Sequence, residues 1–180
     1  MRIIRGNLKG KRIPVPKNFP SRPTTDFAKE GLFNILENKI NIDELSILDL
    51  CTGTGNIAFE FVSRGALYVM AVDSHPVSFN FIRKTISQLN VNDKMEAYKS
   101  DCILFCQNSN KSFDLVYADP PFHLKIHNEL VESIFNGTLL NKNGKVIIEH
   151  GPQTELSGLK YFSFSRKFGN VNFSFFNFEQ

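Results

Sequence analysis

The sequence predicts an α/β protein with a mostly parallel, seven-stranded sheet that is covered by helices on both faces. Three observations support this prediction. From residue 46 onward, short apolar runs alternate with segments of helical periodicity. The apolar runs are nearly continuous, which is typical of strands that are buried on both faces. Two further apolar runs flank Gly169-Asn170 and predict a C-terminal antiparallel hairpin.

Length and composition fit a single domain that spans residues 1–180. The chain is 42% hydrophobic with a mean hydropathy of −0.18, and no apolar run approaches the roughly 18–20 residues of a membrane span. The first six residues lack the apolar core of a secretory signal. The three cysteines form no C-x-x-C motif, so a reduced, cytoplasmic protein is expected.

The N-terminal segment differs in charge from the rest of the chain. Residues 1–25 contain basic side chains and no acidic one, whereas acids outnumber bases in the remainder. Residues 2–16 predict two short strands around a turn at 7–10, so a basic β-hairpin arm (1–24) is expected before an α/β core (25–180). Such an arm suits a polyanion. The candidate RNA-backbone contacts are Arg2, Arg5, Lys9, Lys11, Arg12 and Arg22.

Local signals place each element of the core in order. Thr24 or Thr25 suits the N-cap of a first helix that ends near Lys39. Gly65 closes a second helix, and Pro76 suits the first turn of a third. The expected helices are 25–39, 56–64, 76–89, 101–107 and 127–135. The expected strands are 46–50, 67–73, 95–100, 113–118, 145–149, 161–165 and 171–178.

The end of the first core strand carries a glycine-rich loop, Asp49-Leu50-Cys51-Thr52-Gly53-Thr54-Gly55. In such sheets ligands bind beyond the carboxyl ends of the strands, and glycines let the backbone approach a ligand closely. The Gly-x-Gly-x-x-Ala pattern also fits a dinucleotide-binding loop. Asp49, however, is badly placed beside a pyrophosphate and well placed for an ammonium or sulfonium group. S-adenosylmethionine carries both cations and no phosphate.

Acidic residues also end the next two strands. Asp73, followed by Ser74, is placed to accept hydrogen bonds from ribose hydroxyls, or to cap the helix that Pro76 begins. Asp101 and Cys102 follow the third strand, where a carboxylate and a backbone N–H can read an adenine ring. Capping of the next helix by Asp101 is an equally good interpretation.

The fourth strand ends in Asp119-Pro120-Pro121-Phe122, which suits the presentation of a planar amine. The carboxylate of Asp119 and the carbonyl of Pro120 are hydrogen-bond acceptors, and the prolines stiffen the turn. The ring of Phe122 offers a surface for base stacking. A simple strand terminator is the alternative. His123 and His127 lack further ligands at suitable spacing, so no metal site is expected.

Further strings carry a resemblance that runs nearly end to end. They are Met1-Arg2-Ile3-Ile4, Ser21-Arg22-Pro23-Thr24-Thr25-Asp26, Leu32-Phe33-Asn34-Ile35-Leu36, Ser63-Arg64-Gly65-Ala66 and Arg166-Lys167-Phe168-Gly169. With the glycine loop and the Asp-Pro-Pro-Phe turn, the chain resembles the class I S-adenosylmethionine-dependent methyltransferases, and within them the RsmD-type 16S rRNA (guanine-N2) methyltransferases. Two departures are Phe27, where Arg is usual, and Asp73, where Glu is common.

The resemblance implies a Rossmann-like methyltransferase fold, S-adenosylmethionine as cofactor, and N2 methylation of a guanine in 16S ribosomal RNA or the small subunit. The implied cofactor contacts are Asp49, Cys51, Thr52, Gly53, Thr54, Gly55, Asp73, Ser74, Asp101, Cys102 and Asp119. The implied catalytic residues are Asp119, Pro120, Pro121 and Phe122. Nothing in the sequence demands more than a monomer. The alternatives are adenine N6 or protein glutamine methylation, a nicotinamide-dependent oxidoreductase, and a non-enzymatic RNA-binding protein on this fold.

Overall fold

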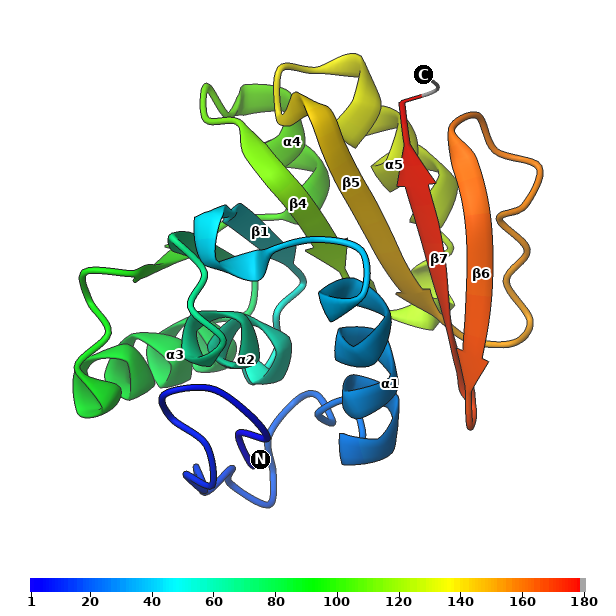
Figure 1. Cartoon of the computed structure of the whole chain (residues 1–180). Coiled ribbons are helices and arrows are strands. Elements are labelled where there is room, and N and C mark those ends of the chain that lie inside the picture. Colours follow the sequence, from blue (N-terminus) through cyan, green and yellow to red (C-terminus); the bar gives the residue numbers. More distant parts are fainter. Residues whose placement is uncertain (179–180) are drawn as a thin grey trace.

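A computed structural model of the protein describes residues 1–178, and its core is one seven-stranded sheet flanked by helices (Figure 1). The strands are β1 (Ser46–Leu50), β2 (Tyr68–Asp73), β3 (Met95–Lys99), β4 (Phe113–Ala118), β5 (Leu140–His150), β6 (Phe162–Phe168) and β7 (Val171–Asn177). The helices are α1 (Asp26–Glu37), α2 (Asn56–Ser63), α3 (Pro76–Leu89), α4 (Cys102–Asn108) and α5 (His127–Asn136), with short 3-10 turns η1 (Ile42–Glu44) and η2 (Phe122–Leu124). None of the helices within the described residues is long and apolar enough to cross a membrane.

The strand order β3-β2-β1-β4-β5-β7-β6 places β1 and β4 at the centre of the sheet. Strands β1 to β5 pair in parallel, and β7 pairs antiparallel with both β5 and β6. This confirms the mostly parallel sheet and the C-terminal hairpin. Because the chain leaves β1 toward β2 and later returns to the other side at β4, the order reverses between β1 and β4, where open α/β sheets bind ligands.

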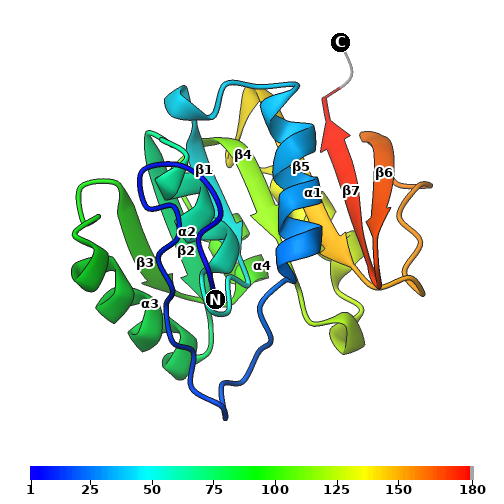
Figure 2. The same cartoon turned by 60° about the horizontal axis from the view of Figure 1, so that its bottom comes forward.

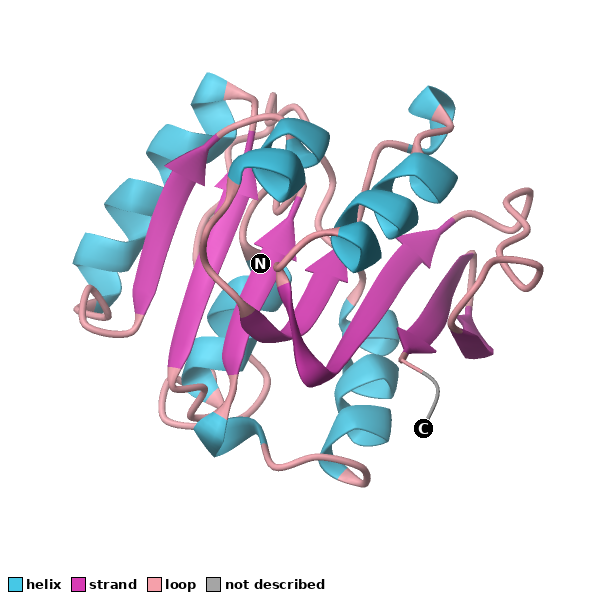
Figure 3. Ribbon diagram, turned by 90° about the horizontal axis from the view of Figure 1, so that it is seen from above, coloured by secondary structure: helices cyan, strands magenta, loops and turns pink. Residues whose placement is uncertain are grey.

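The sheet is buried on both faces, as the continuous apolar strands predicted. Figure 3 shows helices on both sides of the strands. Helices α1, α2 and α3 pack in one hydrophobic cluster, which includes Phe33, Phe59 and Phe61. Helices α4 and α5 pack in the other, with Phe113 and Phe135. Alternate residues of each central strand therefore enter opposite cores.

The N-terminal arm differs from the expected β-hairpin. Its two predicted strands reduce to one antiparallel bridge between Arg2 and Arg12. The backbone N–H groups of Ile3 and Ile13 still donate across the arm, to the carbonyls of Lys11 and Met1. The N–H groups of Ile4 and Arg5 instead donate to the carboxylate of Glu60 on α2. Figure 2 shows this arm lying across α2. It is a packed segment whose conformation depends on a helix far along the chain.

Two strands also differ from their predicted bounds by more than one residue. Strand β5 begins at Leu140, five residues before the expected start, and its pairing with β4 is irregular between Phe113 and Leu115. The run 141–144 is polar and does not show a strand pattern, so the sequence did not predict this extension. Strand β6 continues to Phe168 through Arg166 and Lys167, because an edge strand can keep charged side chains in solvent.

Candidate active site

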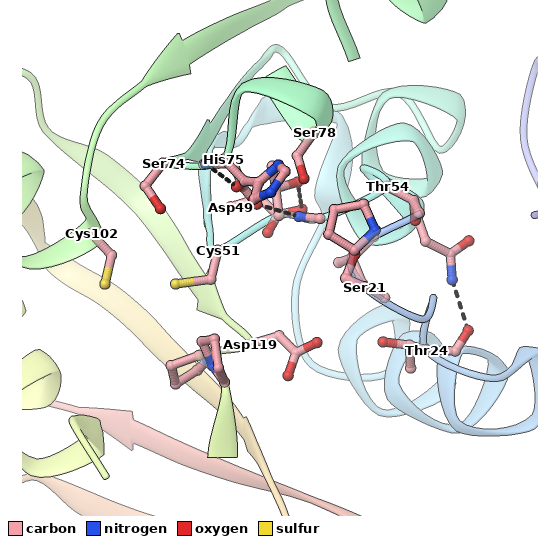
Figure 4. Close-up of a pocket in the computed structure, with 18 of the residues that line it drawn as sticks. Ser21, Thr24, Asp49, Cys51, Thr54, Ser74, His75, Ser78, Cys102 and Asp119 are labelled. Atoms are coloured by element: carbon pink, nitrogen blue, oxygen red, sulfur yellow. Dashed lines mark hydrogen bonds between the residues drawn. The ribbon is translucent and has the colours of Figure 1, made fainter. Parts of the chain in front are cut away.

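One cavity of about 530 Å³ opens at the carboxyl ends of β1, β2 and β4, beside the residues that follow β3. It brings together nearly every cofactor and catalytic residue that the sequence singled out. These are Asp49, Cys51, Thr52, Gly53, Thr54, Asp73, Ser74, Asp101, Cys102, Asp119, Pro120, Pro121 and Phe122. Of that predicted set only Gly55 does not line it. Figure 4 shows how several of these side chains converge.

The loop between β1 and α2 has a backbone that brings it close to the cavity. Gly53 and Gly55 adopt positive φ angles of +55° and +74°, and Cys51 shares the left-handed region at 57°. A Cβ on Gly53 would lie 2.6 Å from the Oγ of Ser21. A side chain at Gly53 would therefore have to displace the hydroxyl of Ser21 and adopt a left-handed backbone conformation. The loop lies against another segment of the chain and leaves its backbone facing the cavity.

Asp49 is a buried carboxylate with one free oxygen. Its side chain is 1% exposed. Its Oδ2 accepts a hydrogen bond from the Oγ1 of Thr52 (2.8 Å), whereas Oδ1 has no hydrogen-bond partner among the described residues. Burial raises the pKa of Asp49 to about 8. A cation entering the cavity would favour the ionised form of this carboxyl, so the position suits the ammonium or sulfonium group of S-adenosylmethionine.

Asp73 organises the glycine loop and does not cap α3. Its Oδ2 accepts from the N–H of Gly53 and its Oδ1 from the N–H of His75, each at 2.8 Å. The N-cap of α3 is instead His75, whose ring accepts from the N–H of Val77. Burial raises the pKa of Asp73. The side chain links β2 to the loop and faces the cavity.

Asp101 both caps a helix and lines the cavity, so it fits both of the roles that the sequence left open. Its Oδ1 caps α4 by accepting from the N–H groups of Ile103 (2.9 Å) and Leu104 (3.1 Å). It also lines the cavity, together with Cys102. The thiols of Cys51 and Cys102 lie on the same side of the cavity (Figure 4). Their hydrogen bond and burial raise the pKa of Cys51 well above its ordinary value.

The Asp-Pro-Pro-Phe turn also lines the cavity. The N–H of Asp119 donates to the carbonyl of Leu50 on β1 (3.2 Å), which holds the turn beside the glycine loop. Burial and the charges of Glu149 and Asp49 raise the pKa of Asp119 well above its ordinary value. Phe122 begins η2, and its side chain is 43% exposed. A Cβ on Gly151 would lie 3.0 Å from its ring, so Phe122 rests on this glycine.

The sequence assigned no role at the site to three polar residues, Thr24, Tyr117 and Glu149, although Glu149 ends a strand near it. Thr24 and Tyr117 line the cavity, and both donate hydrogen bonds to the Oε2 of Glu149, which is 3% exposed. Thr24 was considered only as a helix cap, but Thr25 fills that role. His150 bonds to Ser174 within the sheet. Glu149 could have been predicted as a site residue, because it is a carboxylate at the end of a buried strand, as Asp49 is.

The basic residues of the arm are divided between paired and unpaired side chains. Arg2 lies 3.0 Å from Asp26, and Arg5 lies 2.6 Å from Glu37. Within residues 1–178, Lys9, Lys11 and Arg12 are exposed and form no ion pair; Arg22 is likewise unpaired and lines the cavity. The structure brings only Arg22 of this group to the site.

Comparisons with known proteins agree with this geometry. A family model described as conserved hypothetical protein 95 matches residues 1–177. Two proteins named ribosomal RNA small subunit methyltransferase D, from Buchnera aphidicola subspecies Acyrthosiphon pisum and Baizongia pistaciae, are 31% and 29% identical. These matches cover 82% and 83% of this chain and 76% and 75% of the relatives. A solved putative methyltransferase from Escherichia coli is 24% identical, with a TM-score of 0.85 over 98% of this chain and 97% of that one.

Proposed function

Because this chain belongs to the family described as conserved hypothetical protein 95, the RsmD-type methyltransferases, we propose that it methylates the exocyclic N2 of a guanine in 16S ribosomal RNA. S-adenosylmethionine would be the methyl donor and the small ribosomal subunit or its RNA the substrate. We further propose a cytoplasmic, monomeric enzyme. The observation that carries this proposal is the shared cavity, where the free oxygen of Asp49 and the Asp-Pro-Pro-Phe turn occur together.

The acidic cavity favours a cationic cofactor over a dinucleotide. Asp49, Asp73, Asp101 and Asp119 line it, and Arg22 is the only Lys or Arg among its described lining residues. Carboxylates that outnumber the cations around them repel a pyrophosphate and attract a ligand that carries a sulfonium and an ammonium. When bound, S-adenosylmethionine supplies a methyl group activated by its positively charged sulfur. Asp49 would hold its cationic end, Asp73 its ribose, and Asp101 with Cys102 its adenine.

The residues of the turn provide what the acceptor amine needs. The guanine amine is a poor nucleophile because its lone pair is delocalised into the ring. The Asp119 carboxylate and the Pro120 carbonyl would accept its two N–H bonds and orient the nitrogen. As the nitrogen gains the methyl group it loses one proton, which Asp119 would take. Positioning of this kind contributes roughly 7–11 kcal/mol in well-aligned systems.

The target base must leave its stack before it can enter the cavity. A base in a loop or an unpaired nucleotide is therefore the favoured substrate, because less free energy is needed to unstack it. Phe122, exposed at the rim, would stack on the extruded base. The unpaired basic residues of the arm would contact phosphates.

Transfer of labelled methyl from S-adenosylmethionine tests the proposal. The acceptors are small subunits, and their bare RNA, from cells that lack this gene. The expected result is label in RNA that digests to N2-methylguanosine and disappears with Asp119→Ala. Cofactor binding without label in either acceptor would contradict the RNA substrate and direct the assay to DNA adenine or protein glutamine.

A further inference from the structure

Thr24 is held between two elements that are far apart in the sequence. Its Oγ1 donates to the Oε2 of Glu149 at the end of β5 (2.9 Å). Its carbonyl oxygen accepts from the Nδ2 of Asn56, the first residue of α2 (2.8 Å), and Figure 4 draws this second bond. Glu149 and Asn56 are both buried. Thr24 is therefore tied to both the glycine-loop helix and the sheet.

Glu149 is a buried carboxylate that forms no ion pair within residues 1–178. Its Oε2 accepts from the hydroxyls of Thr24 and Tyr117. An apolar side chain at this position would leave the buried hydroxyl of Tyr117 without this partner, so Glu149 has a structural role within the sheet. Its hydrogen bond to Thr24 reaches outside the sheet and links β5 to the segment before α1.

Residues 20–24, here called the strap, all line the cavity that the proposed function assigns to cofactor and base. The Oγ of Ser21 lies against Gly53 of the glycine loop. Just before the strap, the ring of Phe19 packs on Phe81 of α3, with ring centroids 5.1 Å apart. The strap is thus anchored at its start by an aromatic contact and at its end by Thr24.

Arg22 lies in the middle of the strap. It is exposed, forms no ion pair with any described residue, and is the cavity's only lining Lys or Arg within residues 1–178. A guanidinium fixed beside a base pocket can bind the phosphate of the nucleotide bidentately. The entropic cost of that contact is lower when the backbone is already fixed.

We propose that Glu149 is a positioning residue: through Thr24 it fixes the strap so that Arg22 meets the phosphate next to the target guanine. This inference rests on the proposed function. Glu149 and Thr24 act on RNA binding, and Arg22 makes the contact. Loss of the Thr24 hydroxyl therefore raises the KM for RNA about tenfold, with a smaller change in kcat and in the Kd for S-adenosylmethionine.

The test compares methyl transfer by wild type, Thr24→Val, Thr24→Ser, Arg22→Ala and the double variant of Arg22→Ala with Thr24→Val. Thr24→Val keeps the shape and loses the hydroxyl, and Thr24→Ser restores it. The expected results are a raised KM in Thr24→Val, rescue in Thr24→Ser, and no further rise when Thr24→Val is added to Arg22→Ala. Glu149→Leu should raise the KM for RNA as Thr24→Val does. If Glu149→Leu does not fold, Thr24→Val is a sufficient test by itself. Thr138→Val, an exposed threonine outside the cavity, is the matched control.

The outcomes separate this inference from the proposed function. A wild-type protein that binds cofactor but methylates no RNA would contradict the proposed function, and this inference with it. An active wild type with an unchanged KM in Thr24→Val would overturn the inference alone. So would independent, multiplicative effects of Arg22→Ala and Thr24→Val, since Thr24 would then not act through Arg22.

Discussion

The Nζ of Lys29 lies 3.2 Å from the Oε2 of Glu60, and both side chains are completely buried. Lys29 comes from α1 and Glu60 from α2. Lys29 also donates to the carbonyl of Arg2 (2.7 Å) and to the Oδ1 of Asn56 (2.9 Å). The pair therefore joins the N-terminal arm, the first helix and the helix that follows the glycine loop.

Removing one partner of this pair should destabilise the protein strongly. Glu60 also accepts from the backbone N–H groups of Ile4 and Arg5 and from the Nε of Arg64, so Glu60→Ala leaves an uncompensated ammonium and three further donors without this partner. We expect a loss of about 3–5 kcal/mol in the free energy of unfolding, measured by urea titration.

The control is Lys111→Ala, which breaks an exposed pair with Glu96 (3.3 Å). We expect it to cost less than about 1 kcal/mol, because solvent screens the charges. Equal losses of unfolding free energy in the two variants would show that the buried pair stabilises the protein no more than an exposed pair does.

The stability of the cofactor-free protein should fall as pH rises toward 8. Burial raises the pKa of Asp49 from 3.8 to about 8. Between these values the folded protein keeps a proton that the unfolded chain has lost, so folding is favoured at the lower pH. Urea titrations across this range should show the decline, and Asp49→Asn should remove the part that belongs to Asp49.

Binding of S-adenosylmethionine should show the opposite trend for the same reason. A cation favours the ionised carboxylate, so affinity rises with pH up to about 8 and binding below that pH releases a proton. Calorimetry in buffers of different ionisation enthalpy measures that proton. If the Asp49→Asn variant released the same proton on binding, the proton would come from another acid.

Loss of the Asp119 carboxylate should abolish most turnover while the cofactor still binds. Asp119→Asn keeps an acceptor oxygen but cannot take the proton of the amine, and we expect kcat to fall by about 10²–10³-fold. Because burial and neighbouring acids raise the pKa of Asp119, kcat/KM of the wild type should increase with pH as this group ionises. A pH-independent kcat/KM, or near-normal turnover in Asp119→Asn, would exclude Asp119 as the proton acceptor.

RNA binding by the arm should depend on salt through its unpaired basic residues. Joint replacement of Lys9, Lys11 and Arg12 by Ala should lower the slope of log affinity against log salt by roughly 0.7–0.9 per lost phosphate contact. Arg5→Ala should change it less, because Arg5 is already paired with Glu37. Filter binding at several salt concentrations measures the slope. Lys142→Ala, an exposed change near the start of β5, is the control and should leave it unaltered.

Local patterns predicted the elements that carry the site. Apolar runs predicted the strands. Acidic residues at or just after the ends of these strands predicted that Asp49, Asp101 and Asp119 lie together. This worked because the carboxyl ends of parallel strands meet at one edge, so a sequence position implies a place in space. It failed where partners are distant: the backbone N–H groups of Ile4 and Arg5 donate to Glu60, some 55 residues away.

The sequence by itself determined the layered α/β fold, the glycine loop and the acidic ends of the strands, because each depends on periodicity or on neighbouring residues. Only the tertiary structure decided that Thr24 bonds to Glu149 and that Lys29 is buried against Glu60. Burial of a polar group requires a partner, and that partner can come from any part of the chain. No local pattern records which one the fold brings near.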